Sequence, residues 1–532
     1  FLTKGVVHLS NKVISASQAA ALIKDGSTLA ASAFGLAGWA EEVAIAIKER
    51  FLETGHPKDL TIVHATAIGD HKEKGMHHLG YEGLVKRWIG GHVGAAPSMA
   101  KIIEENKIEA YNLPQGVIVQ LYREIASGRP GLITKVGMGT FVDPRLEGGK
   151  MSDKTKEDIV KVVELEGEEW LFYKTFPIDV ALIRGTVADE NGNLTMDKEG
   201  LLMEALPLAQ ATKNSGGIVI AQVEYVAQAK SLHPKKIKVP GILVDYIVVA
   251  KPENHFQTQQ TLYNPSFSGD VKVPLEGIPR LPLDERKVIA RRCAMELIPG
   301  AIINLGVGMP TGVSSVAAEE GVSEQMILTT EAGTIGGVPG GGLDFGHSYN
   351  AEAIIEHHSQ FDFYDGGGLD ITFLGLAQAD KYGNVNVSKF GTRVTGCGGF
   401  INISQCAKKV VYCGTFTAGG LKVEVSDGKL KIIQEGKYKK FLEQVQQVTF
   451  SGSFADEIGQ DVLYVTERAV FKLLDGQLTL IEVAPGIDPE RDIFPNMGFK
   501  PNISPQLKEM PVEIFQSEWG KLKQIIKRKG DK

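Results

Sequence analysis

The sequence predicts an α/β protein made of two similar halves, each an open and mainly parallel β-sheet with helices on both faces. Short runs rich in Val, Ile and Leu alternate with amphipathic helical patterns from the beginning of the chain. One short motif, with a Gly-Asn pair near its end, occurs twice. The 532 residues are also too many for a single hydrophobic core. Together these observations favour two domains of similar topology.

The first half shows the clearest alternation of elements. Residues 10–24 and 39–51 have helical patterns, whereas residues 26–32 and 59–65 are typical of strands. Because strands separated by helices pair in parallel, we expect a mainly parallel sheet. Residues 141–175 are more charged and less apolar, which predicts an excursion from that sheet. Further strands of this half are expected at 132–136, 179–184 and 217–223.

The repeated motif divides the chain into its two halves. It reads ADENGNL at 188–194 and ADKYGNV at 379–385. Each copy follows an apolar strand, and each is followed by a second strand, at 217–223 in the first half and at 409–413 in the second. Two halves of similar topology explain this arrangement most economically.

The boundaries of the halves follow from composition. A segment rich in Gln, Asn, Ser and Pro, residues 252–277, is the expected connection. We therefore predict an N-terminal domain over 1–260 and a C-terminal domain over 280–518. The second domain opens with a helix rich in Arg and Glu at 283–297. The lysine-rich tail is expected to be the face of a terminal helix or a frayed end. Late strands are expected at 461–471 and 477–483.

Composition excludes several classes of function. The formal net charge of −7 argues against nucleic acid as the main partner. No apolar run reaches the roughly 20 residues that a membrane span needs, and the first residues do not resemble a signal peptide. The four cysteines show no C-x-x-C spacing, and their sparseness suits a reducing compartment. We therefore expect a cytoplasmic protein with neither a membrane nor a nucleic-acid partner.

A glycine-rich loop in the second half is the strongest candidate for the chemistry. It follows the apolar run 325–329, which is typical of a buried strand, and it opens with Glu331. Seven of the sixteen residues from 331 to 346 are glycine, including Gly336 and Gly337, so a regular element cannot persist there. Ligands of open α/β sheets bind at such strand ends. The alternative interpretation is a flexible turn with a solvated glutamate.

Two other loops could complete a pocket with Glu331. The segment 396–400 (GCGGF) contains Gly396, Gly398 and Gly399, whose backbone N–H groups could face a ligand. Gln115 stands at the tip of a Pro-Gln-Gly turn and could donate a hydrogen bond to a ligand carbonyl. A solvated turn glutamine is the alternative for this residue.

Other chemistries have less support. The chain lacks the G-x-x-x-x-G-K-[ST] phosphate loop and the G-x-S-x-G nucleophile elbow. The pairs His77-His78 and His357-His358 have no partners at zinc-ligand spacing, so we interpret them as ordinary histidines and expect no metal. Cys397 could be a thiolate nucleophile, but no Cys–His signature accompanies it, and a buried inert cysteine is favoured.

Five short motifs follow one another along the chain: Pro114-Gln115-Gly116, Gly137-x-Gly139-Thr140, Glu331-x-Gly333 followed by Gly336-Gly337, Gly396-x-Gly398-Gly399-Phe400 and Thr466-Glu467-x-Ala469-Val470-Phe471. These motifs and their order resemble those of family I coenzyme A transferases. The resemblance covers essentially the whole chain and is strongest to the single-chain acetate/propionate members of the family; it is looser to mammalian succinyl-CoA:3-ketoacid CoA-transferase. An E-x-G motif alone would carry little weight, whereas five motifs in the right order are specific.

The resemblance implies a ping-pong transfer through a covalent glutamyl-CoA thioester. Glu331 matches the family's nucleophilic glutamate, and Gln115 matches a glutamine near the reacting carbonyl. The amide of Gly398 or of its neighbour matches a backbone oxyanion donor. Glu467 aligns with a second glutamate of the family. With it, Gly396, Gly399, Gly336, Gly337 and Asn384 are the expected contacts to substrate and CoA.

The resemblance also implies the fold, the partners and the alternatives. The fold would be of the NagB/RpiA/CoA-transferase type, with halves equivalent to the alpha and beta subunits of two-chain relatives. Acyl-CoA and short-chain carboxylic acids would be the substrates, with coenzyme A as a substrate and no separate cofactor. Relatives suggest a homo-oligomer, a dimer or a tetramer. An acyl-CoA hydrolase on the same scaffold and a non-catalytic acyl-CoA sensor remain the alternative functions.

Overall fold

The first half of the chain builds a seven-stranded sheet in which all neighbouring strands run parallel. The structure is a computed structural model that describes residues 12–274 and 280–530. The predicted excursion from this sheet is confirmed, because residues 131–174 contain a separate three-stranded antiparallel sheet, in which the last strand along the chain lies between the other two. The strands of the main sheet are, in spatial order, β13 (Tyr246–Val249), β11 (Ile218–Val223), β8 (Val180–Arg184), β1 (Thr28–Ala31), β2 (Leu60–Ala67), β3 (Val85–His92) and β4 (Glu109–Asn112). The separate sheet contains β5 (Gly131–Thr134), β6 (Val160–Leu165) and β7 (Glu168–Lys174).

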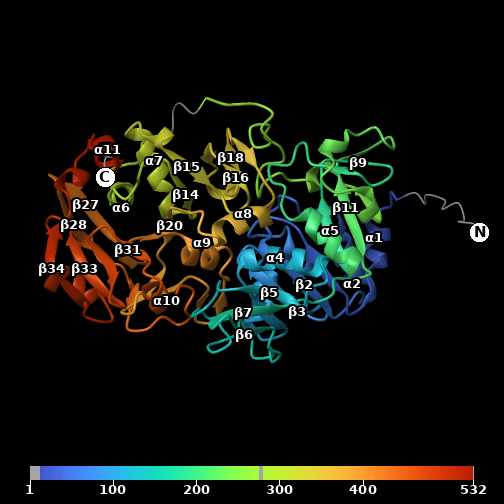
Figure 1. The fold of residues 1–532 in the computed structure, drawn as a ribbon, viewed down its shortest axis with the longest axis horizontal. Helices are drawn as coiled ribbons and strands as arrows, with labels where there is room; N and C mark the ends of the chain where they lie inside the picture. The colour runs from blue at the N-terminus through green and yellow to red at the C-terminus, as the bar shows by residue number, and fades with distance from the viewer. Residues whose placement is uncertain (1–11, 275–279, 531–532) are drawn as a thin grey trace, which may run out of the picture.

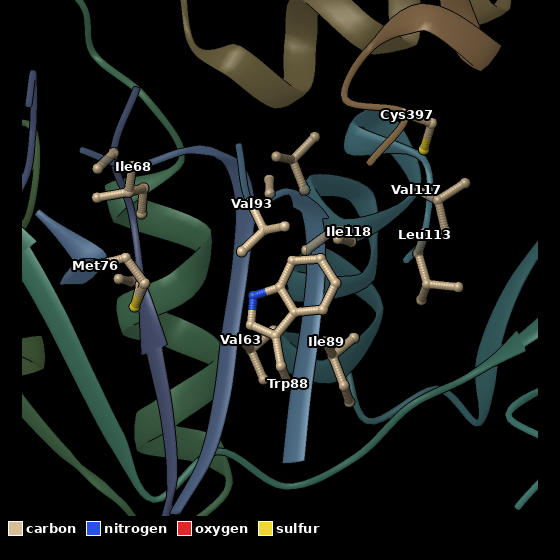
Figure 2. Packing of buried hydrophobic residues seen from close by; sticks show 14 of the residues in the cluster. Val63, Ile68, Met76, Trp88, Ile89, Val93, Leu113, Val117, Ile118 and Cys397 are labelled. Carbon is tan, nitrogen blue, oxygen red and sulfur yellow. The ribbon is translucent and has the colours of Figure 1, made fainter. Parts of the chain in front are cut away.

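Helices cover the first sheet and bury its apolar residues. The predicted helix at 10–24 is shorter in the structure, because Ser15 forms a capping box with Gln18 and starts α1 at Ala16. Trp88 of β3 is fully buried beside Val117 and Ile118 of α4 (Figure 2). Its indole N–H donates to Nε2 of His64 at 2.7 Å. The helices of this half are α1 (Ala16–Leu22), α2 (Glu41–Thr54), α3 (Pro97–Glu104), α4 (Gln115–Ala126) and α5 (Ala205–Asn214).

The second half builds a ten-stranded mixed sheet. Its central strands are parallel, and the strands at both margins include antiparallel pairs. The prediction of one continuous strand at 461–471 is wrong, because these residues form a hairpin. The side-chain hydroxyl of Thr466 accepts a hydrogen bond from the N–H of Ala469 in the turn. The strands are β19 (Ala353–Ile354), β16 (Thr334–Ile335), β15 (Met326–Thr329), β14 (Ala301–Leu305), β20 (Ile371–Gly375), β25 (Lys409–Cys413), β31 (Asp461–Val465), β32 (Ala469–Leu474), β33 (Gln477–Val483) and β34 (Asn502–Glu509).

The two sheets confirm the predicted repeat. Five strands follow the same spatial order in both halves, β13-β11-β8-β1-β2 in the first and β31-β25-β20-β14-β15 in the second. The repeated motif forms the same turn in both copies. In the first copy, Asp189 accepts from the backbone N–H of Asn193 at 2.9 Å; in the second, Asp380 accepts from that of Asn384 at 3.1 Å. The mixed α/β fold with two similar open sheets is therefore as the sequence predicts.

The two halves share one interior. The largest cluster of buried apolar side chains includes Ile118 of α4 together with Phe361 and Ile401 from the second half. In Figure 1, α8 and α9 lie beside α4 at the centre of the molecule, and α4 contacts α8 directly. A smaller apolar cluster belongs to the second half alone. The helices of this half are α6 (Glu285–Ala294), α7 (Gly312–Glu319), α8 (His357–Asp365), α9 (Phe400–Cys406), α10 (Gly452–Glu457) and α11 (Leu522–Gly530).

The lysine-rich tail is the helix α11, as predicted. Leu522 and Ile526 are buried in the second apolar cluster, so one face of the helix packs against the protein. Within residues 12–274 and 280–530, no helix has both the length and the apolar character that a bilayer crossing requires.

Candidate active site

Glu331 stands in the turn that joins β15 to β16, at the carboxyl end of a central parallel strand. Backbone hydrogen bonds from Gly333 to Thr330, at 3.1 Å, and from Thr330 to Thr334, at 3.0 Å, close the turn. The hydroxyl groups of Thr330 and Thr334 bond to each other at 2.8 Å inside it. The flexible-turn interpretation is therefore not supported, because the backbone on both sides of the glutamate is fixed.

Gly333 allows the tight approach of this turn to the next segment. Its φ is 108°, and a Cβ placed on it would lie 2.2 Å from the carbonyl oxygen of Ile355. Backbone cannot yield at such a distance, and side chains rarely adopt this φ. The glycine in the E-x-G motif is thus required by the fold of the turn.

The variant Gly333→Ala is expected to displace the Glu331 turn and to lower both stability and activity. The added methyl group would overlap the Ile355 carbonyl, and the cost of such overlap and strain is typically about 1–3 kcal/mol. Thermal melting and acyl-transfer assays would measure the two effects. Gly391→Ala is the matched control, because its φ is also positive, at 61°, but no atom lies within 4 Å of its added Cβ. Equal losses in both variants would contradict the steric explanation.

The surroundings of Glu331 adjust its ionisation. Desolvation raises the pKa of the Glu331 carboxyl above its ordinary value of 4.5. The imidazole of His357 and the side-chain amide of Asn304 act in the opposite direction and lower that pKa. The carboxylate of Glu331 is half-buried, so fewer water molecules bind it than in bulk solvent. Because a weakly solvated carboxylate has less water to lose before it attacks, Glu331 is suited to act as a nucleophile.

Gln115 is the first residue of α4, and its side chain is only 3% exposed. The solvated-turn alternative is therefore wrong. Gly116 is not a turn glycine either, because it lies in α4. It allows close contact with α9, since a Cβ there would lie 2.3 Å from Nδ2 of Asn402. The backbone N–H of Gln115 donates to the carbonyl of Gly398 at 2.9 Å, which fixes the helix start against the second half.

The side chain of Gln115 leads to two groups that the sequence did not single out. Its Nε2 atom lies 2.8 Å from Nε2 of His357, and Nδ1 of His357 lies 2.6 Å from a carboxylate oxygen of Glu204. His357 and Glu204 are completely buried. The sequence predicts His357 to be an ordinary histidine, and its neighbour His358 has an equal sequence signal. Only the tertiary fold brings Glu204 to this histidine from 153 residues away.

The 396–399 loop is bonded to the first half of the chain. The N–H of Cys397 donates to the side chain of Asn112 at 2.9 Å, and the N–H of Gly398 donates to the carbonyl of Gly91 at 2.7 Å. A Cβ on Gly396 would lie 2.7 Å from the same Gly91 oxygen, so glycine is needed for this close approach. Cys397 is buried, and burial raises the pKa of its thiol, as expected for an inert cysteine.

The loop offers one free backbone donor beside Gln115. The Gly398 N–H is already used, whereas the N–H of Gly399 has no acceptor among the residues that the structure describes. A Cβ placed on Gly399 would lie 3.6 Å from Oε1 of Gln115. Of the two amides that the sequence analysis considered, Gly399 is therefore the one available to a ligand.

Two expected contact residues are occupied in the scaffold. Asn384 donates to Asp380 at 3.1 Å and accepts from the N–H of Gly452 at 2.9 Å. Glu467 is completely buried, where one oxygen accepts from Arg468 and the other from the N–H of Phe416. Both side chains hold turns of the second half, and the structure gives neither of them a free polar atom for substrate.

A cavity of about 850 Å³ is bordered by residues that flank the Glu331 turn in the chain. It is lined by Leu328, just before the turn, and by Gly336 and Gly337, just after it. Phe345 and Tyr349 add aromatic surface, and α7 forms the opposite wall. The cavity is large enough for part of an extended ligand, and its lining residues Leu328 and Gly336 precede and follow Glu331 in the chain.

The chain is similar to several known proteins. The family model described as Coenzyme A transferase matches residues 13–250. The chain is 56% identical to a caffeate CoA-transferase of Acetobacterium woodii, over 97% of this chain and 99% of that protein. It is 46% identical to the acetate CoA-transferase YdiF of Escherichia coli K12, over 94% of this chain and 95% of that protein. The crystal structure of YdiF from E. coli O157:H7 as a thioester complex with CoA has a TM-score of 0.90 at 44% identity, covering 96% of each chain.

Proposed function

The chain belongs to the coenzyme A transferase family, and we propose that it exchanges CoA between short-chain carboxylic acids through a covalent intermediate on Glu331. The observation that supports this most is the position of Glu331, which lies in a fixed turn near His357, the contact of Gln115, with residues that flank the turn lining a large cavity. Similarity to a protein crystallised as a CoA thioester supports the covalent route.

The proposed reaction begins with attack of the Glu331 carboxylate on the carbonyl carbon of an acyl-CoA. The C–S bond breaks, which gives an acyl-glutamyl anhydride and CoA thiolate. The thiolate then attacks the glutamyl carbonyl, forming the enzyme–CoA thioester and releasing the first acid as its carboxylate. A second carboxylate reverses these steps and leaves as its CoA thioester. One thioester is exchanged for another, so the sequence needs no other energy source.

Each attack passes through a tetrahedral oxyanion that needs hydrogen-bond donors. We infer that the N–H of Gly399 and the side-chain amide of Gln115 are these donors, because they lie beside each other and Gln115 contacts His357, which is near Glu331. Losing one such donor typically costs about 2.7–4 kcal/mol of transition-state stabilisation. The cavity bordered by Gly336 and Gly337 would hold the long arm of CoA, whose binding energy positions the thioester.

The test is an acyl-exchange assay with a panel of acceptor acids. Acetyl-CoA is mixed with the protein and with propionate, butyrate, acetoacetate or caffeate, and the new acyl-CoA is measured by liquid chromatography and mass spectrometry. Rapid formation of propionyl-CoA or butyryl-CoA is expected. Caffeate is included because the caffeate CoA-transferase is the more similar of the two relatives described above. Release of CoA without any acceptor acid would instead favour the hydrolase alternative, and binding without turnover would favour the sensor.

The rate of adduct formation is expected to fall in acid. Because desolvation raises the pKa of Glu331 above 4.5, the nucleophilic carboxylate is lost at a higher pH than an ordinary glutamate would show. The measurement is the rate of CoA attachment to the protein after mixing with acetyl-CoA, followed by intact mass from pH 4.5 to 8. An unchanged rate down to pH 4.5 would contradict this prediction. The melting temperature at each pH shows whether the protein is folded.

A further inference from the structure

Glu204, His357 and Gln115 form a row of hydrogen-bonded side chains that leads to the reaction centre. Glu204 precedes α5 in the first half, His357 begins α8 in the second half, and Gln115 begins α4 in the first. The two contacts in the row are 2.6 Å and 2.8 Å long, and no member is more than 3% exposed. Bulk water therefore does not compete for any of these hydrogen bonds.

The donors and acceptors of this row are interdependent. An ionised Glu204 can only accept, so the proton of a neutral His357 must sit on Nδ1. Nε2 of His357 is then bare and accepts from the Nε2–H of Gln115, as in the structure. In this arrangement Oε1 of Gln115 faces Gly398 and Gly399, where a Cβ on either glycine would lie 3.6 Å from it.

A second proton on the Glu204–His357 pair reverses the amide. His357 would then donate from Nε2, and only Oε1 of Gln115 could accept that hydrogen bond. A half turn of the terminal amide brings its NH₂ group to face Gly399. Only this second arrangement places two N–H donors, from Gln115 and Gly399, on the same side of the reacting carbonyl. An oxygen there would repel the developing oxyanion.

We propose that Glu204 and His357 are positioning residues. When this pair carries a second proton, His357 turns the Gln115 amide so that its NH₂ group faces Gly399, and transfer of CoA requires this state. This inference rests on the proposed function. It is supported by a second observation, because the other carboxylate oxygen of Glu204 is buried with no hydrogen-bond partner in the described part of the chain. A buried carboxylate so poorly satisfied is stabilised by a full positive charge on its neighbour.

The charged and titratable groups around His357 are consistent with this role. Two carboxylates lie near it: that of Glu204 from the first half, 2.6 Å from its Nδ1, and that of Glu331 from the β15–β16 turn. On the same helix, burial and, to a smaller extent, Arg123 lower the pKa of the His358 imidazole. Tyr122 of α4 faces Glu204, and burial raises the pKa of its phenol well above the ordinary value, so it does not titrate in the working range.

The test is the dependence of kcat on pH for transfer from acetyl-CoA to propionate. The variant Glu204→Gln removes the carboxylate and should make the pair lose its proton more easily. We expect its alkaline loss of kcat to lie about 1 to 3 pH units below that of the wild type, with little change in KM. His357→Gln has no proton to lose, so its kcat should be lower by about 100-fold or more, without this alkaline loss. His358→Gln is the matched control and should keep the wild-type profile.

The conservative variant Glu204→Asp keeps the charge and is expected to restore the wild-type pH profile at a reduced kcat. A uniform loss of kcat in Glu204→Gln, with the profile in place, would overturn the inference and leave a structural role only. So would a Glu204→Asp profile equal to that of Glu204→Gln. A wild type that forms adduct and transfers CoA keeps the proposed function intact in either case, whereas a wild type without adduct or transfer would overturn both. Melting curves identify variants that fail to fold.

Discussion

Replacing Glu331 with glutamine is expected to abolish CoA transfer and CoA attachment together. Glutamine has the size of glutamate but is not a nucleophile at neutral pH, so the first covalent step cannot occur. Wild-type protein mixed with acetyl-CoA should gain the mass of CoA, less one water, on the peptide that contains Glu331. The variant should gain nothing, and its exchange rate should fall by at least about 1,000-fold.

The control for this experiment is Glu457→Gln, which changes an exposed glutamate in α10 of the same half. It should keep full activity and the full adduct. Transfer that persists in Glu331→Gln would show that another group is the nucleophile. Transfer with no adduct in either protein would favour a direct reaction between acid and thioester.

The variant Gln115→Met is expected to lower kcat by about 100- to 1,000-fold while changing KM little. Methionine has a similar length and preserves packing in a site that is only 3% exposed, but it cannot donate to an oxyanion. The loss should therefore appear in the transition state rather than in binding of CoA. Steady-state kinetics with acetyl-CoA and propionate separate the two parameters.

A suitable control is Gln210→Met in α5, where the glutamine is exposed. Its kinetics should match those of the wild type. If Gln115→Met instead raised KM and left kcat intact, Gln115 would contribute to substrate binding and not to stabilisation of the oxyanion.

Much of the fold could be predicted because strands and helices are specified by local patterns. The strands β25 and β33 have the predicted bounds, and the repeated turn at Asp189 and Asp380 was visible as a short motif. The errors occur where a signal has two physical meanings. Gly116 reads as a turn glycine, yet it is in a helix and allows close contact with Asn402. The segment after Val465 reads as a continuous strand, yet a single hydroxyl turns it into a hairpin.

The candidate site could be predicted only in part, for a related reason. Glu331 and the 396–399 loop carry local signals, namely a strand end and clustered glycines. Glu204 and His357 carry none, because their roles arise from a contact between residues far apart in the chain. The distinction between the Gly398 and Gly399 amides likewise depends on Gly91, which only the assembled structure brings to that loop.

The shared interior of the two halves has a consequence for how this enzyme can change. The nucleophile and its proposed partner Gln115 come from opposite sides of a seam filled by side chains such as Ile118, Phe361 and Ile401. Their separation is thus a property of packed helices, which deform little. Substitutions of residues that line the cavity are therefore expected to change the preferred acid more readily than substitutions in the seam. In the seam, a side chain of different volume would misalign the reacting groups.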